Sequence, residues 1–301
     1  MELLFIIFPV FFIFAVGFIG QKLIGFNIKS ISTTALYLMS PFLAFRTFYG
    51  NPLTWDYFYI ILFSLLLSIL LFLIVWITAR AMKANRSERS AMILGGVFMN
   101  SGNYGAPVVL FALGAVGFDY AVIMMVFQSL LMNTFGIFFA SLGSNDRATW
   151  QDAMRRVIRM PLIYAAVLGV FLQFFAIRLP EPLMEGISLV ADASIPTVML
   201  VLGMQLAAVA RKKVAYKYVT AVTMIRMVAS PILAMLIVLF LPVNDLLRSV
   251  LIIQASMPAA ANTTMFALQF GTEADLVSFT TFVTTMISIL TIPLILFLLG
   301  V

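Results

Sequence analysis

Apolar residues run along this chain in long, almost unbroken stretches, and polar residues gather in the short segments between them. A helix needs about 20 mainly apolar residues to cross the hydrocarbon core of a bilayer. The pattern predicts ten such helices joined by short connections, with no domain outside the membrane. The predicted spans cover residues 3–20, 31–49, 57–81, 91–113, 121–142, 161–179, 183–209, 218–241, 246–270 and 276–299.

The composition places the chain in lipid rather than in water. Of its 301 residues, 63% are apolar and only 10% are charged, whereas soluble domains are about 45–50% apolar and about 25% charged. A soluble protein of this size cannot bury so much apolar surface. We therefore expect an all-α, multi-pass protein of the plasma or inner membrane, surrounded by the lipid bilayer.

Basic residues gather on alternate connections. Most of the 18 Lys and Arg residues lie in the segments that follow the odd-numbered spans. Connections rich in Lys and Arg stay in the cytoplasm, so both termini are expected on the extracytoplasmic side. This topology accounts for the net charge of +6, and no nucleic-acid partner is expected. The basic residues on the cytoplasmic side are Lys22, Lys29, Arg80, Lys83, Arg86, Arg89, Arg147, Arg155, Arg156, Arg159, Arg211, Lys212, Lys213 and Lys217.

Ten spans divide into two sets of five, and an odd number per set makes the second set enter the membrane in the opposite sense. Such inverted repeats are common in secondary transporters. Pro41 and Pro196 are separated by the same interval as Ser101 and Ser256. The sequence predicts two inverted five-helix repeats, residues 1–142 and 161–301, joined by a cytoplasmic linker at residues 143–160.

The fourth and ninth spans carry polar and helix-breaking residues near the middle of the membrane. The fourth reads GGVFMNSGNYGAP from position 95, and the ninth reads QASMPAAANTT from position 254. Proline removes a backbone N–H and clashes with the carbonyl four residues earlier, and Gly102 and Gly105 relax the backbone further. We expect both helices to be broken, with second halves that begin near Pro107 and Pro258.

Two broken helices that meet at mid-membrane predict a site for an anion. A helix N-terminus carries roughly half a positive charge, and its free N–H groups bind anions such as carboxylates. Asn100, Asn103 and Asn262 add amide donors, while the freed carbonyls can hold Na⁺ or a water molecule. The alternative is a pair of ordinary kinked helices, with Gly for close packing and Asn for hydrogen bonds between helices.

Three more polar residues lie inside predicted spans, and each has two interpretations. Gln128 lines the site or makes a hydrogen bond between helices. Asp192 serves coupling or gating, or pairs with Arg46 at the outer end of the second span. Arg226 attracts a substrate carboxylate through its two-pronged guanidinium, or extends its head group to the cytoplasmic surface.

The chain contains no Cys and no His, which excludes disulfides, thiolate nucleophiles and Ser-His hydrolysis. An intramembrane aspartyl protease needs two facing carboxylates, and only Asp192 is well embedded. We therefore expect no enzyme and no resident metal or cofactor. Coupling to H⁺, to Na⁺ or to neither ion is left open.

The run NSGNYGAP from Asn100, with MPAAAN from Met257, resembles the auxin efflux carrier (AEC) family of transporters over essentially the whole chain. The resemblance implies a fold similar to the bile acid:sodium symporters, with spans 1, 2, 6 and 7 in a scaffold and spans 3–5 and 8–10 in a transport core. It also implies that the broken helices cross at Pro107 and Pro258 and that Asn100 contacts the substrate. Unlike the plant members, this chain has a short linker and no charged residue within positions 57–78.

Short members of this kind resemble malonate or malate permeases. We expect a secondary transporter that moves a small organic anion, a mono- or dicarboxylate, by alternating access. The alternative is a ligand-sensing or channel-like protein on the same fold, and a homodimer is left open. The expected substrate-binding residues are Asn100, Ser101, Asn103, Tyr104, Gln128, Asn262 and Thr263; Gly102, Gly105, Pro107 and Pro258 shape the crossover, and Asp192 and Arg226 are candidates for coupling or gating.

Overall fold

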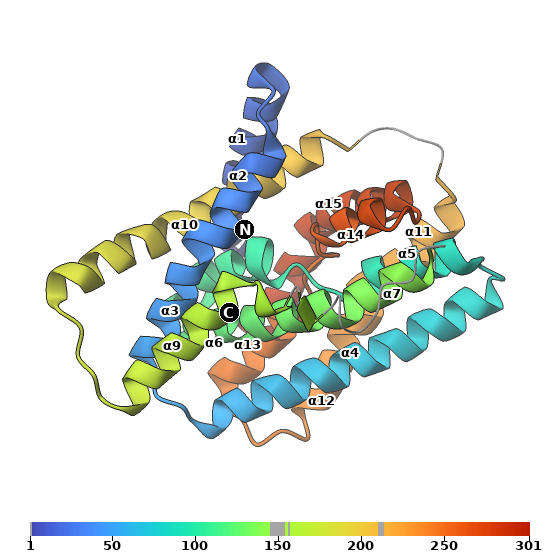
Figure 1. Ribbon diagram of the computed structural model, residues 1–301. Coiled ribbons are helices and arrows are strands. Elements are labelled where there is room, and N and C mark those ends of the chain that lie inside the picture. Colours follow the sequence, from blue (N-terminus) through green and yellow to red (C-terminus); the bar gives the residue numbers. More distant parts are fainter. Residues whose placement is uncertain (1, 145–153, 156, 210–213) are drawn as a thin grey trace.

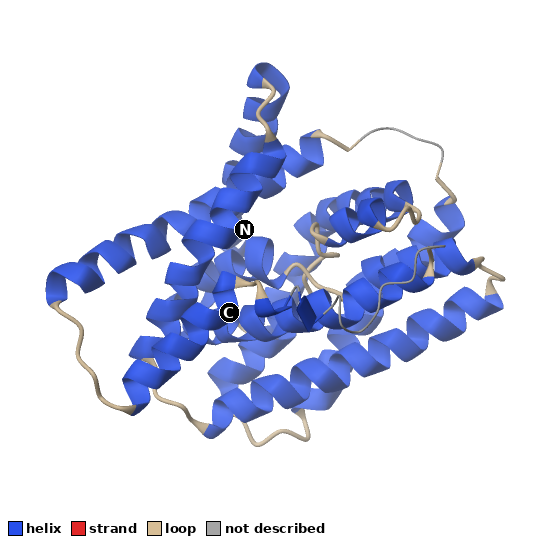
Figure 2. Cartoon of the chain, viewed as in Figure 1, coloured by secondary structure: helices blue, strands red, loops and turns tan. Residues whose placement is uncertain are grey.

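The computed structural model describes residues 2–144, 154–155, 157–209 and 214–301, and over these ranges the chain is helical and contains no strand (Figure 1; Figure 2). The all-α expectation is confirmed for them. Most of the predicted linker, residues 143–160, lies outside the described residues. In the described part, six helical stretches are long and apolar enough to cross a membrane: Ile6–Ile24, Trp55–Ala81, Ser101–Leu142, Glu181–Ala207, Tyr216–Val238 and Ala274–Leu299.

The helices follow one another along the chain as α helices (α) and short, wider π-helical segments (η). They are α1 (Glu2–Ile24), α2 (Ile28–Thr34), η1 (Ala35–Met39), α3 (Ser40–Gly50), α4 (Trp55–Ala81), α5 (Arg86–Val97), η2 (Ser101–Gly105), α6 (Ala106–Leu131), η3 (Met132–Gly136), α7 (Ile137–Leu142), α9 (Pro161–Phe174), α10 (Glu181–Ala207), α11 (Tyr216–Met224), η4 (Ile225–Ala229), α12 (Ser230–Val238), α13 (Asp245–Ala255), α14 (Thr263–Gln269) and α15 (Ala274–Leu299).

Three prolines follow directly on π-helical segments. Pro41, Pro107 and Pro231 are the second residues of the helices that succeed η1, η2 and η4. In each case the residue before the proline donates its N–H to a carbonyl five residues earlier. Because proline has no N–H and its ring displaces the carbonyl four residues back, the wider π turn accommodates it. The helix therefore continues through these prolines.

Two helices are interrupted close to where the sequence predicts. α5 ends at Val97 and η2 begins at Ser101, whereas α13 ends at Ala255 and α14 begins at Thr263. Pro258 lies inside the second interruption. Pro107 lies inside α6 instead, so the first interruption is at residues 98–100, nearer to Asn100 than we expected from the proline.

The two interruptions pair with each other through their backbones. The Asn100 N–H donates to the Pro258 carbonyl and the Ala260 N–H to the Phe98 carbonyl, each at 2.9 Å. These bonds flank an antiparallel bridge between Met99 and Ala259. Both segments are buried. The pairing supplies partners that the helical hydrogen bonds no longer provide, which is the condition for unwound backbone inside a membrane.

Gly114 bends the longest apolar stretch. Residues 101–142 form 42 residues of nearly continuous helix, roughly 60 Å at 1.5 Å per residue and twice the thickness of the hydrocarbon core. Gly114 has φ 72° and ψ −166°, outside helical geometry. This conformation favours glycine, and it falls where the sequence predicts the connection between the fourth and fifth spans.

Glycines allow close packing between the two halves of the sequence. Gly17 of α1 faces the backbone of Leu200, and Gly203 of α10 faces the backbone of Phe14, so closely that a Cβ atom at either glycine would overlap a carbonyl. Gly169 of α9 lies in the same way against the α3 backbone at Phe45. Helices α1 and α10, and helices α3 and α9, therefore pack as pairs (Figure 1).

The backbone bridge can be tested by a disulfide, because the chain has no Cys of its own. Met99 and Ala259 form a pair without mutual hydrogen bonds, whose Cα atoms lie about 4.5 Å apart in antiparallel pairing and suit a disulfide. The Met99→Cys/Ala259→Cys variant should cross-link almost completely under mild oxidation with diamide. After oxidation the protein is denatured and its free thiols are measured, so that missing free thiol reports cross-linking.

A pair at Met99→Cys and Ala267→Cys, whose second site lies further along α14, is the matched control and should stay largely reduced. Equal cross-linking in both pairs would contradict the register of the bridge.

Candidate functional site

A cavity of about 530 Å³ lies against the paired interruptions, within the size range of small-molecule sites. Its walls come from η1 and the helices on either side of it, from the interruptions, from α6 and η3, and from α10 and α14. Most of the wall is apolar, formed by residues such as Leu36, Phe98, Met125, Val198 and Phe266. The sequence-predicted residues that line it are Asn100, Ser101, Gly102, Asn103, Pro107, Gln128 and Asn262.

Asn100 is held at the cavity wall by its own backbone. Its N–H donates to Pro258, and its carbonyl accepts the Gly105 N–H at 2.9 Å. The residue is 5% exposed, and its Nδ2 group is buried without a hydrogen-bond partner. Buried polar groups are nearly always paired, so this free amide donor is a candidate contact for a ligand or water.

Gln128 repeats this feature from the neighbouring helix. It is 3% exposed, and both Nε2 and Oε1 are buried without a partner. Gln205 of α10 also lines the cavity, with a buried and unpaired Oε1. We did not predict Gln205, although a lone Gln in an apolar span is a signal that could have indicated it. In contrast, Asn133 donates to the Ser129 carbonyl at 2.8 Å and stays within its helix.

Four of the predicted substrate-binding and crossover residues do not line the cavity. The Tyr104 hydroxyl is within 2.8 Å of the Ser288 hydroxyl, and its ring packs edge-on against Phe11 and Phe14. Tyr104 therefore faces α1 and α15 in this conformation, and its expected contact with substrate stays a prediction. The other three, Thr263, Gly105 and Pro258, serve the crossover: Thr263 donates to the Ala260 carbonyl, Gly105 packs closely against Gln254, and Pro258 accepts from Asn100.

Arg226 reaches neither the cavity nor the cytoplasmic surface. It is completely buried, and its guanidinium donates to carbonyls at the ends of α5 and α13. The interpretation in which its head group extends to the cytoplasmic surface is therefore wrong in this structure, whereas the attraction of a substrate carboxylate stays a prediction. Arg226 turns inward because each interrupted helix leaves carbonyls without N–H partners, and the guanidinium supplies five donors.

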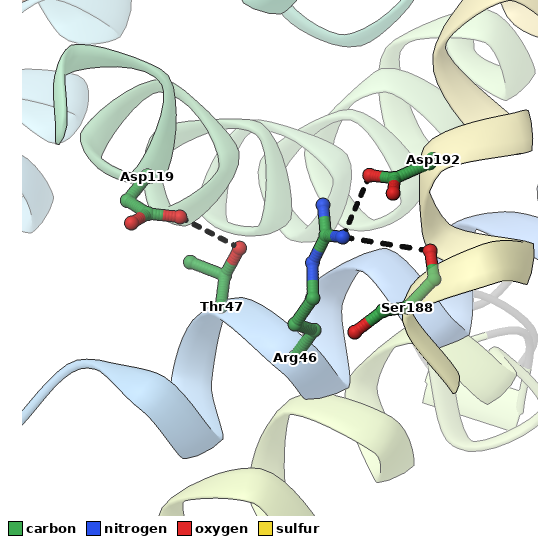
Figure 3. A network of polar contacts seen from close by, with 5 residues as sticks. All are labelled: Arg46, Thr47, Asp119, Ser188 and Asp192. Atoms are coloured by element: carbon green, nitrogen blue, oxygen red, sulfur yellow. Dashed lines mark hydrogen bonds and ion pairs between the residues drawn. The ribbon is translucent and has the colours of Figure 1, made fainter. Parts of the chain in front are cut away.

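A polar network lies next to the cavity (Figure 3). Its residues are close in sequence to Leu43, Phe118 and Ser194, which line the cavity from three helices. Arg46 of α3 pairs with Asp192 of α10 at 2.7 Å and donates to the Ser188 carbonyl at 3.5 Å; the Thr47 hydroxyl donates to Asp119 of α6 at 3.2 Å. Asp192 is thus paired with Arg46, as the structural interpretation predicted.

The cavity wall also includes Lys29, which is exposed at the start of α2. Within the described ranges, Lys29 is the one charged residue of the lining, and no Asp or Glu contributes to it. A cavity with amide donors, apolar walls and a cation at its mouth suits a small organic anion. It offers a place to bind such a molecule and, in the described wall, no nucleophile with an adjacent base.

The fold and the cavity define a helical membrane protein with a small-molecule site among its helices. The chain belongs to the membrane transport protein family, whose sequence model matches residues 3–296. The resemblance to auxin efflux carriers is thereby confirmed, and the protein is a transporter and not an enzyme.

The relatives of this chain include two archaeal proteins and one bacterial protein. An uncharacterised transporter of Methanocaldococcus jannaschii is 26% identical over 70% of this chain and 69% of its own length. Another from Methanothermobacter thermautotrophicus is 27% identical over 73% and 72%. A Rhizobium meliloti protein named "Putative malonate transporter" is 24% identical over 97% of this chain and 94% of its own.

A stability comparison tests whether Gln128 is held for binding or for structure. Gln128→Leu removes no hydrogen bond, so it should leave the thermal unfolding temperature of the detergent-purified protein unchanged or raise it. Thr284→Val is the control, because the Thr284 hydroxyl accepts the Ala259 N–H at 3.2 Å. That variant should lose about 1 kcal/mol. An equal loss in both variants would make Gln128 a structural residue.

Proposed function

We propose that the protein is a secondary transporter that carries a small organic anion, a mono- or dicarboxylate, across the membrane by alternating access. The observation that carries the proposal is the pair of buried, unpaired amides, Asn100 and Gln128, that face one cavity beside the paired interruptions. Amide N–H groups bind a carboxylate without a buried cation beside it. Ser101, at the start of η2, adds the N-terminal end of a long helix, which favours negative charge.

The proposed architecture has ten crossings in two inverted repeats, residues 1–142 and 161–301. Interrupted segments in corresponding halves support it, as does the bend at Gly114. The pairs α1 with α10 and α3 with α9 join the first and seventh, and the second and sixth, predicted spans. These four spans form the scaffold of the proposal, and the remaining six form the transport core.

The cavity is proposed to face the cytoplasm. Its open mouth carries Lys29, on a connection that the charge pattern assigns to the cytoplasm. Next to the cavity lie the Arg46–Asp192 pair and the Thr47–Asp119 bond, which tie α3 to α10 and α6. We propose that these contacts form the outer gate, and that they separate when the core moves against the scaffold. A gate that separates in this way belongs to a carrier rather than to an open channel.

Malonate is the first substrate to test, because a relative's name mentions it. In proteoliposomes, Asn100→Ala and Gln128→Leu should each lower kcat/KM for labelled malonate by about 10- to 100-fold, since a hydrogen bond to a charged group contributes about 1.5–3 kcal/mol. Gln173→Leu, on α9 and outside the cavity lining, makes the same substitution and should transport normally.

If malonate is not taken up, thermal shifts with other mono- and dicarboxylates identify a ligand. Unchanged kinetics in both cavity variants, with a confirmed substrate, would contradict the proposed site.

The proposed topology predicts where the termini lie. An epitope tag at either end should react with antibody added outside intact spheroplasts, because the basic connections hold the opposite ends of the spans in the cytoplasm. A Cys introduced at Lys83, on a predicted cytoplasmic connection, is the control and should be labelled by a membrane-impermeant maleimide only after permeabilisation. Tags that react only after permeabilisation would reverse the orientation and with it the direction in which the cavity opens.

A further inference from the structure

Arg226 is a buried cation that the proposed transport site does not use. It lies in η4 and is completely buried. In the described part of the chain, ion pairs join Arg46 to Asp192 and Arg248 to Asp245, and no carboxylate there pairs with Arg226. A buried charge without compensation is costly. Its compensation must therefore come from other groups.

The compensation comes from the carbonyls of the interruptions. Nε of Arg226 donates to the Met257 carbonyl at 3.0 Å. Nη1 donates to the carbonyls of Gly96 and Val97 at 3.5 and 3.2 Å. Nη2 donates to the Ala255 carbonyl at 2.5 Å. One side chain thus bonds to the last turn of α5 and to the end of α13, two segments that are far apart in the sequence.

The partial negative charges of the two helix ends balance the positive charge of Arg226. The C-terminal end of a helix carries roughly half a negative charge, so two such ends offset about one positive charge. Ser230 completes the cluster, since its hydroxyl accepts from Nη2 of Arg226 at 2.9 Å and donates to Ala255 at 2.7 Å. Carbonyls at helix C-termini are the groups with which transporters hold Na⁺. Here the guanidinium binds carbonyls that, from the sequence, we expected to be available to Na⁺ or a water molecule.

We propose that Arg226 is a positioning residue: a cation fixed to the chain that holds the two interruptions together and so keeps Asn100 turned into the cavity. The connection is short. Val97 and Met257, whose carbonyls Arg226 holds, are the neighbours of Phe98 and Pro258, whose carbonyls accept the two bonds of the backbone bridge. The effect on transport rests on the proposed function, whereas the effect on the bridge does not.

The test uses the full chain and two measurements. Arg226→Ala is made in the Met99→Cys/Ala259→Cys background for the rate of cross-linking, and in the native background for malonate uptake. We expect a protein that elutes as a single species but cross-links at least about tenfold more slowly and takes up malonate at least about tenfold more slowly. Methylguanidinium, which can enter the vacated space, should restore both rates. Arg248→Ala is the control. Its cross-linking and uptake rates should equal those of the wild type, with or without methylguanidinium.

Arg226→Lys covers the case in which the alanine variant fails to fold. Lysine keeps the charge but offers three donors where five bonds are made, so cross-linking should fall between the wild type and Arg226→Ala. A wild-type cross-linking rate in either Arg226 variant would overturn the proposal, as would slow cross-linking that methylguanidinium does not change. If the bridge depends on Arg226 while no carboxylate is transported by the wild type, the positioning role stands and the proposed function fails.

Discussion

The centre of this structure depends on one constraint: polar backbone groups that lie within apolar surroundings must find a partner. The chain breaks two helices in such surroundings, which frees N–H and C=O groups on both. The two breaks supply hydrogen-bond partners to each other, through the bonds that join Asn100 to Pro258 and Ala260 to Phe98. Thr284 and Arg226 take up groups that the bridge leaves over. A defect in either helix alone would be unstable, but the two together form a compact, bonded element.

The cavity is a consequence of that element. Backbone pairing fixes residues 98–100, and this fixes the direction of the Asn100 side chain, whose amide then has no protein partner. Gln128 is left unpaired on the adjacent helix in the same way. Satisfied backbone and unsatisfied side chains lie next to each other, so rigidity and binding capacity come from the same few residues. Proteins give up stability in this manner where a ligand is to be bound.

The charged group that holds the interruptions together is separate from the groups that line the cavity. Arg226 lies behind the interruptions and is offset by two helix ends, while the described wall of the cavity carries amides and one exposed lysine at its mouth. An anion in the cavity would thus meet neutral donors along the wall rather than a buried ion pair. Neutral donors release a ligand more readily than a desolvated charge pair does, which suits a carrier that must let its substrate go.

The sequence by itself indicated the long apolar stretches, the connection that follows residue 113 and the two interruptions, because hydropathy, glycine and proline act locally on the chain. It also indicated Asn100 and Gln128, since a polar amide within an apolar span must bind either another helix or a ligand. Only the tertiary structure decided that Tyr104 faces Ser288, that Gln205 joins the cavity and that Arg226 turns inward to the carbonyls. These helices are apolar on all sides, so no amphipathic pattern tells which face meets protein and which meets lipid. The neighbours of a helix settle that choice, and they come together only when the chain folds.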